Sequence, residues 1–267
     1  MSNLSKNRIC FVVPTYPPHF NFARELLNSY QTFLRDQADF YFVFTNELEQ
    51  SLFGTAENAI ILPLELRVFS YRGIINIKKF YALTVLQNQY DYIICLDSEA
   101  RFIKHVDLLT LCETYFQEKK LLGSTALLDT KPFTNKCLSH FCETLDCSVL
   151  NQSLYLWFNN LPIYQSAMLP DFFEKTELLG NLKQLTYNDF DYYIFMYYLL
   201  FYQNFTVVDL EIEAPWSALE TAKQNLTLKS DAYKQHSLYL CHPTAQTLFE
   251  NPWLFLLVHL DREPITS

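Results

Sequence analysis

Residues 91–100 read DYIICLDSEA, and this stretch decides how the chain is expected to fold. Its middle part is short, apolar and rich in β-branched side chains, which is the pattern of a buried strand. The apolar run ends abruptly at Asp97 and Glu99, two carboxylates separated by Ser98. Ligands of open α/β sheets bind at the carboxyl ends of the strands. We therefore expect an acidic turn at the mouth of a cleft.

Strand-like and helix-like patterns alternate on both sides of this stretch. Short apolar runs predict further strands at 8–13, 40–44, 58–62, 121–127, 154–158 and 205–210. Helical spacing of apolar residues predicts helices at 21–36, 46–52, 74–89, 107–119 and 188–202. Asn21 is expected to cap the first helix, and Asn188 or Asp189 the last. The alternation favours helices packed on a mostly parallel sheet.

Composition and charge narrow the class of protein. Half of the 267 residues are apolar, which is enough for a sizeable core in a single domain. The net charge of −9, with only short basic runs, argues against nucleic acid as a main partner. An acidic protein can still bind a phosphorylated ligand through a divalent cation. No signal peptide or membrane-spanning stretch is visible, so a cytoplasmic location is expected.

The seven cysteines are odd in number and indicate free thiols rather than a disulfide framework. Four candidate zinc ligands cluster in the middle of the chain: Cys137, His140, Cys142 and Cys147. The cluster lacks the paired C-x2-C spacing that is typical of zinc sites, so mostly buried free thiols are the preferred interpretation.

Several common motifs are absent. The chain has only four glycines, and no G-x-G-x-x-G follows the first predicted strand. This disfavours a dinucleotide-binding Rossmann site. No P-loop, no G-x-S-x-G elbow and no H-E-x-x-H pair occurs. A nucleotide must therefore be bound by another device.

The acidic turn supplies such a device. Carboxylates two positions apart on a turn can converge on one hard cation, and Mg²⁺ or Mn²⁺ is expected with oxygen ligands. Such a cation neutralises a diphosphate and stabilises it as a leaving group. The alternative is that Asp97 and Glu99 are ordinary solvated turn residues.

These features resemble the GT-A glycosyltransferases. In that family the first strand ends in a loop that holds the nucleotide base, and a later strand ends in a D-x-D-type motif that holds metal and diphosphate. The matching segments here are FVVPTY at 11–16 and IICLDSEA at 93–100, with Glu99 as the second acid. The resemblance implies a twisted, mostly parallel sheet with helices on both faces and an acceptor-side insertion. It divides the single domain, 1–267, into a nucleotide-binding half, 1–128, and an acceptor-binding half, 129–267.

The resemblance also implies a function. We expect a metal-dependent hexosyltransferase of bacterial glycan, lipooligosaccharide or capsule synthesis. It would transfer a sugar from a nucleotide-diphosphate donor, first of all a UDP-sugar, to a hydroxyl of a glycan or glycolipid. The many Tyr and Phe residues allow peripheral contact with the inner face of the membrane.

The resemblance assigns donor-binding roles by position. Pro14, Thr15 and Tyr16 would border the nucleotide, or form only a proline-stiffened turn. Further residues would contact the diphosphate or donor sugar: Arg72, Lys78, Lys79, Asp97 and Ser98. For the cations among them, an ordinary solvated helix face is the alternative.

Three more residues complete the predicted site. Asp189 or Asp191 would face the acceptor as the catalytic base of an inverting enzyme. His242 would join Asp97 and Glu99 on the metal, although a lone histidine is more often structural. Two other functions stay open: a nucleotidyltransferase on a related sheet, and a non-catalytic protein that binds a glycan or another partner.

Overall fold

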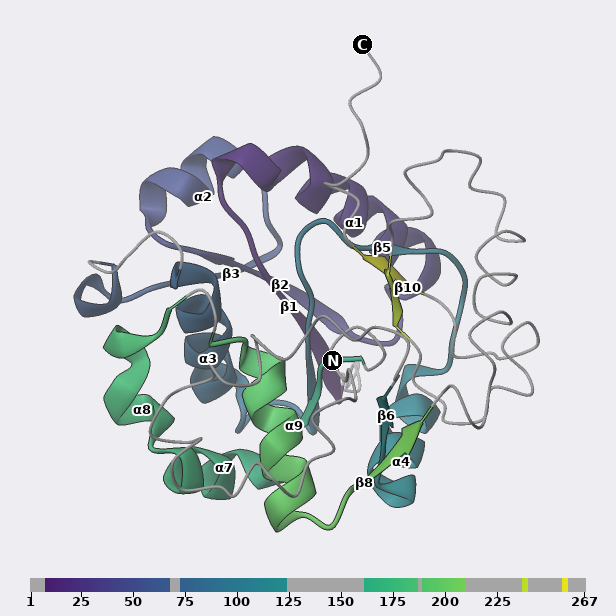
Figure 1. The fold of residues 1–267 in the computed structure, drawn as a ribbon. Coiled ribbons are helices and arrows are strands. Elements are labelled where there is room, and N and C mark those ends of the chain that lie inside the picture. Colours follow the sequence, from purple (N-terminus) through teal and green to yellow (C-terminus); the bar gives the residue numbers. More distant parts are fainter. Residues whose placement is uncertain are drawn as a thin grey trace, which may run out of the picture.

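A five-stranded sheet forms the centre of the protein (Figure 1). The computed structural model describes residues 8–67, 73–123, 161–186, 189–209, 237–239 and 256–258. The central strands are β1 (Ile9–Pro14), β2 (Asp39–Phe44), β3 (Asn58–Ile61), β4 (Tyr92–Cys95) and β7 (Ile163–Gln165). They are ordered β3-β2-β1-β4-β7, and only β7 runs antiparallel to its neighbour. The expected mostly parallel sheet is confirmed.

Helices cover both faces of this sheet. The helices are α1 (Phe20–Phe33), α2 (Glu47–Phe53), α3 (Ile74–Leu86), α4 (Leu108–Glu118), α7 (Leu169–Thr176), α8 (Leu178–Asn181) and α9 (Asp191–Tyr202). Within the described ranges, the 3₁₀ turns are η1 (Pro17–His19), η2 (Leu64–Leu66), η6 (Ser166–Met168) and η7 (Leu182–Gln184). Figure 1 shows α1 and α2 on one side of the sheet, and α3 with α7, α8 and α9 on the other. The prediction of helices on both faces is therefore confirmed.

Two small sheets connect late segments to the first half of the chain. An antiparallel sheet has the order β5 (Arg101–Phe102), β10 (Leu256–Val258), β9 (Ser237–Tyr239). A parallel pair joins β6 (Lys120–Gly123) to β8 (Thr206–Asp209). The β5 strand follows the acidic turn directly, so the turn leads into the first of these small sheets.

The strand order reverses direction beside β1. The chain moves outward from β1 to β2 and β3, and then returns through α3 to place β4 on the other side of β1. Because β1 and β4 are parallel, the loop after β1 and the turn after β4 leave the sheet at the same edge. In open α/β sheets, ligands bind in the crevice at such a reversal point.

Aromatic side chains fill the core on both sides of the sheet. On the α1 side, the Phe11 ring lies 6.1 Å from that of Tyr30 and 5.0 Å from that of Phe102. On the α3 side, the Phe172 ring lies 6.3 Å from Phe80 and 5.1 Å from Phe195. Strand side chains alternate between faces, so each central strand contributes to both layers.

Two helix starts differ from the sequence prediction. Asn21 lies inside α1, whose N-cap is His19, because Pro17 and Pro18 form the 3₁₀ turn η1 that runs directly into the helix. The N-cap of α9 is Phe190 and not Asp189. The other predicted helix ends lie within three residues of the observed ones, and Asn46 caps α2 by accepting from Glu49 N at 2.9 Å.

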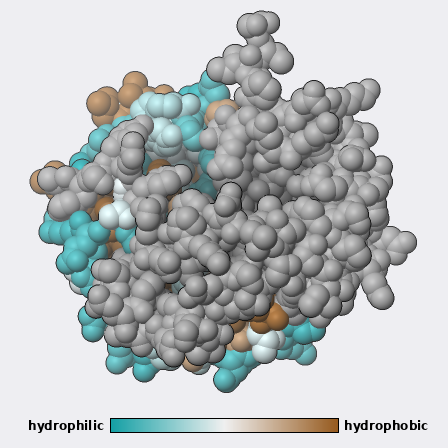
Figure 2. Space-filling view, in the orientation of Figure 1, coloured by the Kyte–Doolittle hydropathy of each residue, from teal (hydrophilic) through white to brown (hydrophobic). Residues whose placement is uncertain are grey.

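The surface in Figure 2 is largely hydrophilic where its atoms are described, with a few separate apolar areas. The large apolar side chains that are exposed include Leu48, Leu52 and Leu64. Within the described ranges, none of the helices has both the length and the apolar character needed to cross a bilayer. Peripheral membrane contact stays a prediction.

Candidate functional site

The acidic turn lies where the sequence predicted it, directly after β4. The side chain of Cys95 is fully buried, and Asp97, two positions later, is directed toward α3. A turn then closes, with Ala100 N donating to Asp97 O at 3.2 Å. This turn interrupts the strand alternation, so that Ser98 and Glu99 contact His19 at the start of α1. The two carboxylates therefore have different partners.

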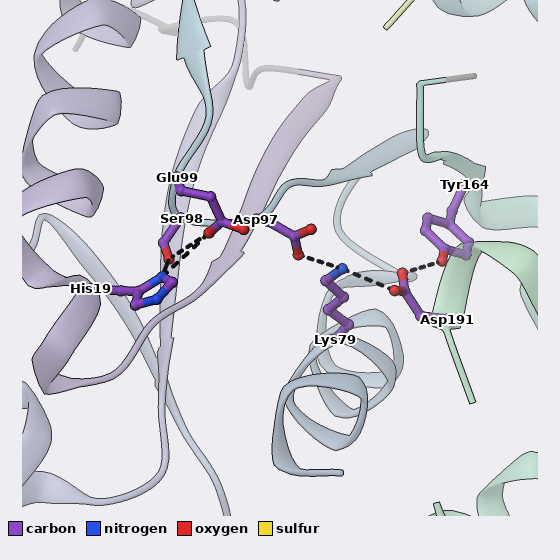
Figure 3. Close-up of polar contacts among 7 residues, drawn as sticks. All are labelled: His19, Lys79, Asp97, Ser98, Glu99, Tyr164 and Asp191. Atoms are coloured by element: carbon purple, nitrogen blue, oxygen red, sulfur yellow. Dashed lines mark hydrogen bonds and ion pairs between the residues drawn. The ribbon is translucent and has the colours of Figure 1, made fainter. Parts of the chain in front are cut away.

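Lys79 connects the acidic turn to α9 (Figure 3). Its Nζ lies 2.9 Å from Asp97 Oδ1 and 2.9 Å from Asp191 Oδ1. The Lys79 side chain comes from the second turn of α3 and is 8% exposed, so the ammonium has left bulk water. Three elements distant in sequence thus meet at one charged group.

Both carboxylate oxygens of Asp191 are occupied. Oδ1 accepts from Lys79, and Oδ2 accepts from the hydroxyl of Tyr164 at 2.6 Å. The Asp191 side chain is 3% exposed. From the sequence, Asp191 is one of two possible catalytic bases. Its contacts here are those of a residue that holds Lys79 in place.

Neighbouring charges control the protonation of this group. Burial alone lowers the pKa of Lys79, but the charges of Asp191 and Asp97 outweigh it and raise the pKa well above its ordinary value. Burial, together with the Asp191 charge, raises the pKa of the Tyr164 phenol well above its ordinary value. Lys79 is therefore charged, and Tyr164 is a neutral donor, at any physiological pH.

The second arm of the turn contacts η1. His19 Nδ1 lies 3.2 Å from Ser98 Oγ and 3.4 Å from Glu99 Oε2. Ser98 Oγ in turn donates to Glu99 Oε2 at 3.3 Å. The His19 ring stacks on Tyr16, with ring centroids 4.4 Å apart. The loop after β1 and the turn after β4 are thus joined by side chains.

Lys78 binds the backbone of the loop that follows β1. Its Nζ donates to Thr15 O at 2.6 Å and lies 3.1 Å from Glu49 Oε2, and its side chain is completely buried. Glu49 also accepts from Thr45 N at 2.7 Å, one residue before the Asn46 cap of α2. Burial lowers the pKa of Lys78, and Glu49 partly restores it. The direct diphosphate contact expected of Lys78 stays a prediction, since its amine here supports the backbone at Thr15.

Asp189 precedes α9 and is fixed by its own loop. Its Oδ2 accepts from Thr186 N at 2.6 Å and from Thr186 Oγ1 at 2.7 Å. The same loop packs on the start of α3, where Asn76 Nδ2 donates to Thr186 O at 3.0 Å. No partner of Asp189 Oδ1 is present among the described residues. Both carboxylate oxygens of Asp191 accept hydrogen bonds from described residues, whereas only Oδ2 of Asp189 does.

The donor types at the turn suit a hard cation. Asp97 and Glu99 provide carboxylate oxygens on side chains that are 24% and 12% exposed, and Mg²⁺ and Mn²⁺ prefer oxygen ligands. Across the ranges that the structure describes, no three His, Cys, Asp or Glu side chains group closely enough to hold a metal. Water, a ligand oxygen or His242 would have to complete the coordination. His242 and Arg72, like Cys137, His140, Cys142 and Cys147, lie outside the described residues.

The contacts of three residues at this site were not predicted from the sequence. His19, Glu49 and Tyr164 all contact a predicted site residue through long-range pairings. The Asn46-x-x-Glu49 spacing is a capping signal that could have identified Glu49. Tyr164 is one of 18 tyrosines, and no local pattern distinguishes it.

A cavity of about 370 Å³ lies elsewhere, between residues 31–37 at the end of α1 and His105. None of its lining residues belongs to the acidic turn or contacts Lys79. The geometry of the turn, and not this cavity, therefore defines the candidate site.

Comparison with known proteins adds no family assignment. No protein-family model matches the chain, and no curated protein matches it. The class that fold and site define is thus an α/β protein with a mostly parallel sheet and a charged site at the β1/β4 edge.

Proposed function

We propose that this protein is a glycosyltransferase of GT-A type that uses a nucleotide-sugar donor and a divalent cation. One observation carries the proposal: Asp97 and Glu99 follow β4 at the edge where the strand order reverses, beside the loop that follows β1. The alternative of an ordinary solvated turn is disfavoured, because Ser98 is 3% exposed and the Asp97 and Glu99 side chains are only 24% and 12% exposed.

The charge of the site supports a cation. Asp97, Glu99 and Asp191 supply three negative charges against one positive charge from Lys79, which leaves −2 with His19 neutral. A diphosphate brought to this site alone would meet repulsion. A bound Mg²⁺ or Mn²⁺ would neutralise the excess and supply charge stabilisation for the departing diphosphate.

The chain's own residues have distinct roles in the proposed reaction. Tyr16, stacked on His19, borders the nucleotide, and Thr15 beside it is held by Lys78. Lys79 has three N–H donors and two carboxylate partners, so one donor can bind a phosphate oxygen. Pro14, Arg72 and Ser98 complete the proposed donor contacts, and His242 the proposed metal ligands.

Asp189 is the proposed general base. In an inverting transfer, a carboxylate takes the proton from the acceptor hydroxyl as that oxygen attacks the sugar carbon. The Thr186 hydrogen bonds hold Asp189 Oδ2 and leave Oδ1 for this role. A glycan or glycolipid is the proposed acceptor, met in the cytoplasm or at the inner face of the membrane.

Product analysis tests the proposal. The purified chain is incubated with UDP-, GDP-, dTDP- and CMP-sugars, Mn²⁺ and a mixture of glycan and lipid acceptors, and released nucleotides are separated by chromatography. We expect Mn²⁺-dependent release of a nucleoside diphosphate from at least one donor, and its loss in Asp97→Asn. Release of pyrophosphate from nucleoside triphosphates would instead indicate a nucleotidyltransferase. Absence of any nucleotide binding or turnover would favour a non-catalytic binding protein.

A further inference from the structure

We infer that Lys79 and the divalent cation share Asp97, and that Asp191 controls how strongly Lys79 occupies it. The inference rests on the proposed metal site. It adds two residues, Asp191 and Tyr164, that regulate metal binding without binding the metal themselves. It makes Asp191 and Tyr164 positioning residues, in place of the catalytic role expected for Asp191.

The first argument is the asymmetry of burial around Lys79. Its Nζ is 2.9 Å from both carboxylates, but Asp191 is 3% exposed and Asp97 is 24% exposed. A buried carboxylate that loses its only cation is strongly destabilised. Asp191 is therefore the permanent partner of Lys79. Asp97 is the more exposed of the two carboxylates, and it is therefore the partner that a second cation can reach.

The second argument is that Asp191 cannot turn away. The Tyr164 hydroxyl donates to Oδ2 at 2.6 Å while Lys79 holds Oδ1. Tyr164 lies on β7, which pairs with β4, and is itself fully buried. The anchor of Lys79 is thus built into the sheet next to the strand that carries Asp97.

The third argument concerns the field at Asp97. A cation beside a carboxylate lowers the affinity of that carboxylate for another cation. Asp191 opposes this effect by drawing the charge of Lys79 away from Asp97. Neutral Asn at 191 would leave Lys79 paired with Asp97 alone and weaken metal binding. Removal of both Lys79 and Asp191 would leave Asp97 without this competitor.

Two variants distinguish the effect of the competition between Lys79 and the metal from the effect of the net charge of the site. Asp191→Asn changes the site charge from −2 to −1, counting Asp97, Glu99 and Lys79. The double variant Lys79→Met/Asp191→Asn leaves Asp97 and Glu99, which again sum to −2, as in the wild type. A site governed by net charge alone predicts equal affinity for the wild type and the double variant. Competition at Asp97 predicts tighter binding by the double variant.

The experiment titrates each full-length protein with Mn²⁺ without nucleotide and measures free Mn²⁺ by electron paramagnetic resonance. We expect at least about threefold weaker binding by Asp191→Asn and at least about threefold tighter binding by the double variant, given the size of charge effects on carboxylates. Far-ultraviolet circular dichroism checks each fold. If the double variant does not fold, Tyr164→Phe replaces it. This variant keeps all charges, makes Asp191 depend more on Lys79, and is expected to bind Mn²⁺ more tightly.

The outcomes separate the inference from the proposed function. Wild-type Mn²⁺ binding with unchanged or weaker affinity in the double variant would overturn the inference and leave the metal site standing. No Mn²⁺ binding by the wild type, with or without nucleoside diphosphates, would overturn both.

Discussion

Lys79 Nζ and Asp97 Oδ1 lie 2.9 Å apart and join the second turn of α3 to the turn that follows β4. This ion pair orients the Asp97 carboxylate toward α3, because the same ammonium is also held by Asp191 Oδ1 at 2.9 Å. Glu99 belongs to the same turn but pairs with His19 at 3.4 Å. The acidic turn is thus held on one side by α3 and on the other by the loop after β1.

Replacement of Asp97 by Asn is expected to abolish sugar transfer and to preserve the fold. The lost carboxylate removes a proposed metal ligand, which we expect to reduce turnover by about 100-fold or more. Lys79 keeps Asp191, so no buried charge is left unpaired. Turnover and thermal unfolding would be measured together, with the exposed Asp36→Asn as a matched control. Wild-type turnover by Asp97→Asn would exclude the acidic turn from the reaction.

Replacement of Lys78 by Met is expected to destabilise the protein through the loop after β1. The change removes the donor to Thr15 O and the partner of Glu49. We expect the free energy of unfolding to fall by about 2–3 kcal/mol, since Glu49 retains Thr45 N and some solvent contact. Urea denaturation would show the loss, and Lys175→Met on the exposed side of α7 serves as the comparison. Equal stability of the two variants would contradict a supporting role for Lys78.

Gly73 permits a close approach between the start of α3 and the loop before α9. A Cβ at this position would lie 2.3 Å from Leu185 O, which is a backbone atom and cannot rotate away. Gly73→Ala should therefore lower the free energy of unfolding by about 2 kcal/mol or more. Gly180 in α8 has open space around its Cβ position, so Gly180→Ala provides a matched control with little effect. A Gly73→Ala protein as stable as Gly180→Ala would show that this loop is not tightly packed on α3.

Alkaline pH is expected to weaken the fold through its buried tyrosines. Burial and the nearby Asp39 charge raise the pKa of Tyr30 to about 12, and burial and the Asp191 charge raise the pKa of Tyr164 well above its ordinary value. Both folded pKa values exceed the unfolded value of about 10. Their stabilisation is therefore complete below pH 10 and is lost as pH rises through the folded pKa values. Denaturant unfolding between pH 8 and 11, with phenolate absorbance, should show decreasing stability above pH 10. Constant stability up to pH 11 would contradict the burial of these phenols.

The fold was largely predictable from local pattern, and the site only in part. The strand before Asp97 is a short apolar run bounded by acids, so its position and its sharp end were visible in the sequence. The start of α1 was not, because Pro17 and Pro18 begin a 3₁₀ turn that displaces the expected cap at Asn21.

Long-range partners explain the rest of the difference. Lys79 and Asp191 are 112 positions apart, and no local pattern links them. Adjacent lysines on a helix usually indicate a solvated face. Here α3 packs against the central sheet, and both Lys78 and Lys79 are buried. Periodicity predicts which helices form, but not which charged side chains the packed helices enclose.

The most direct test of the metal-assisted nucleotide site is a crystal structure of the protein soaked with Mn²⁺ and a nucleoside diphosphate, with UDP and GDP tried in turn. The proposed site predicts an anomalous manganese peak bonded to Asp97 and to oxygens of the diphosphate, with the base beside Tyr16. Manganese and nucleotide bound away from the turn after β4, or clear maps at saturating concentrations with neither present, would contradict it.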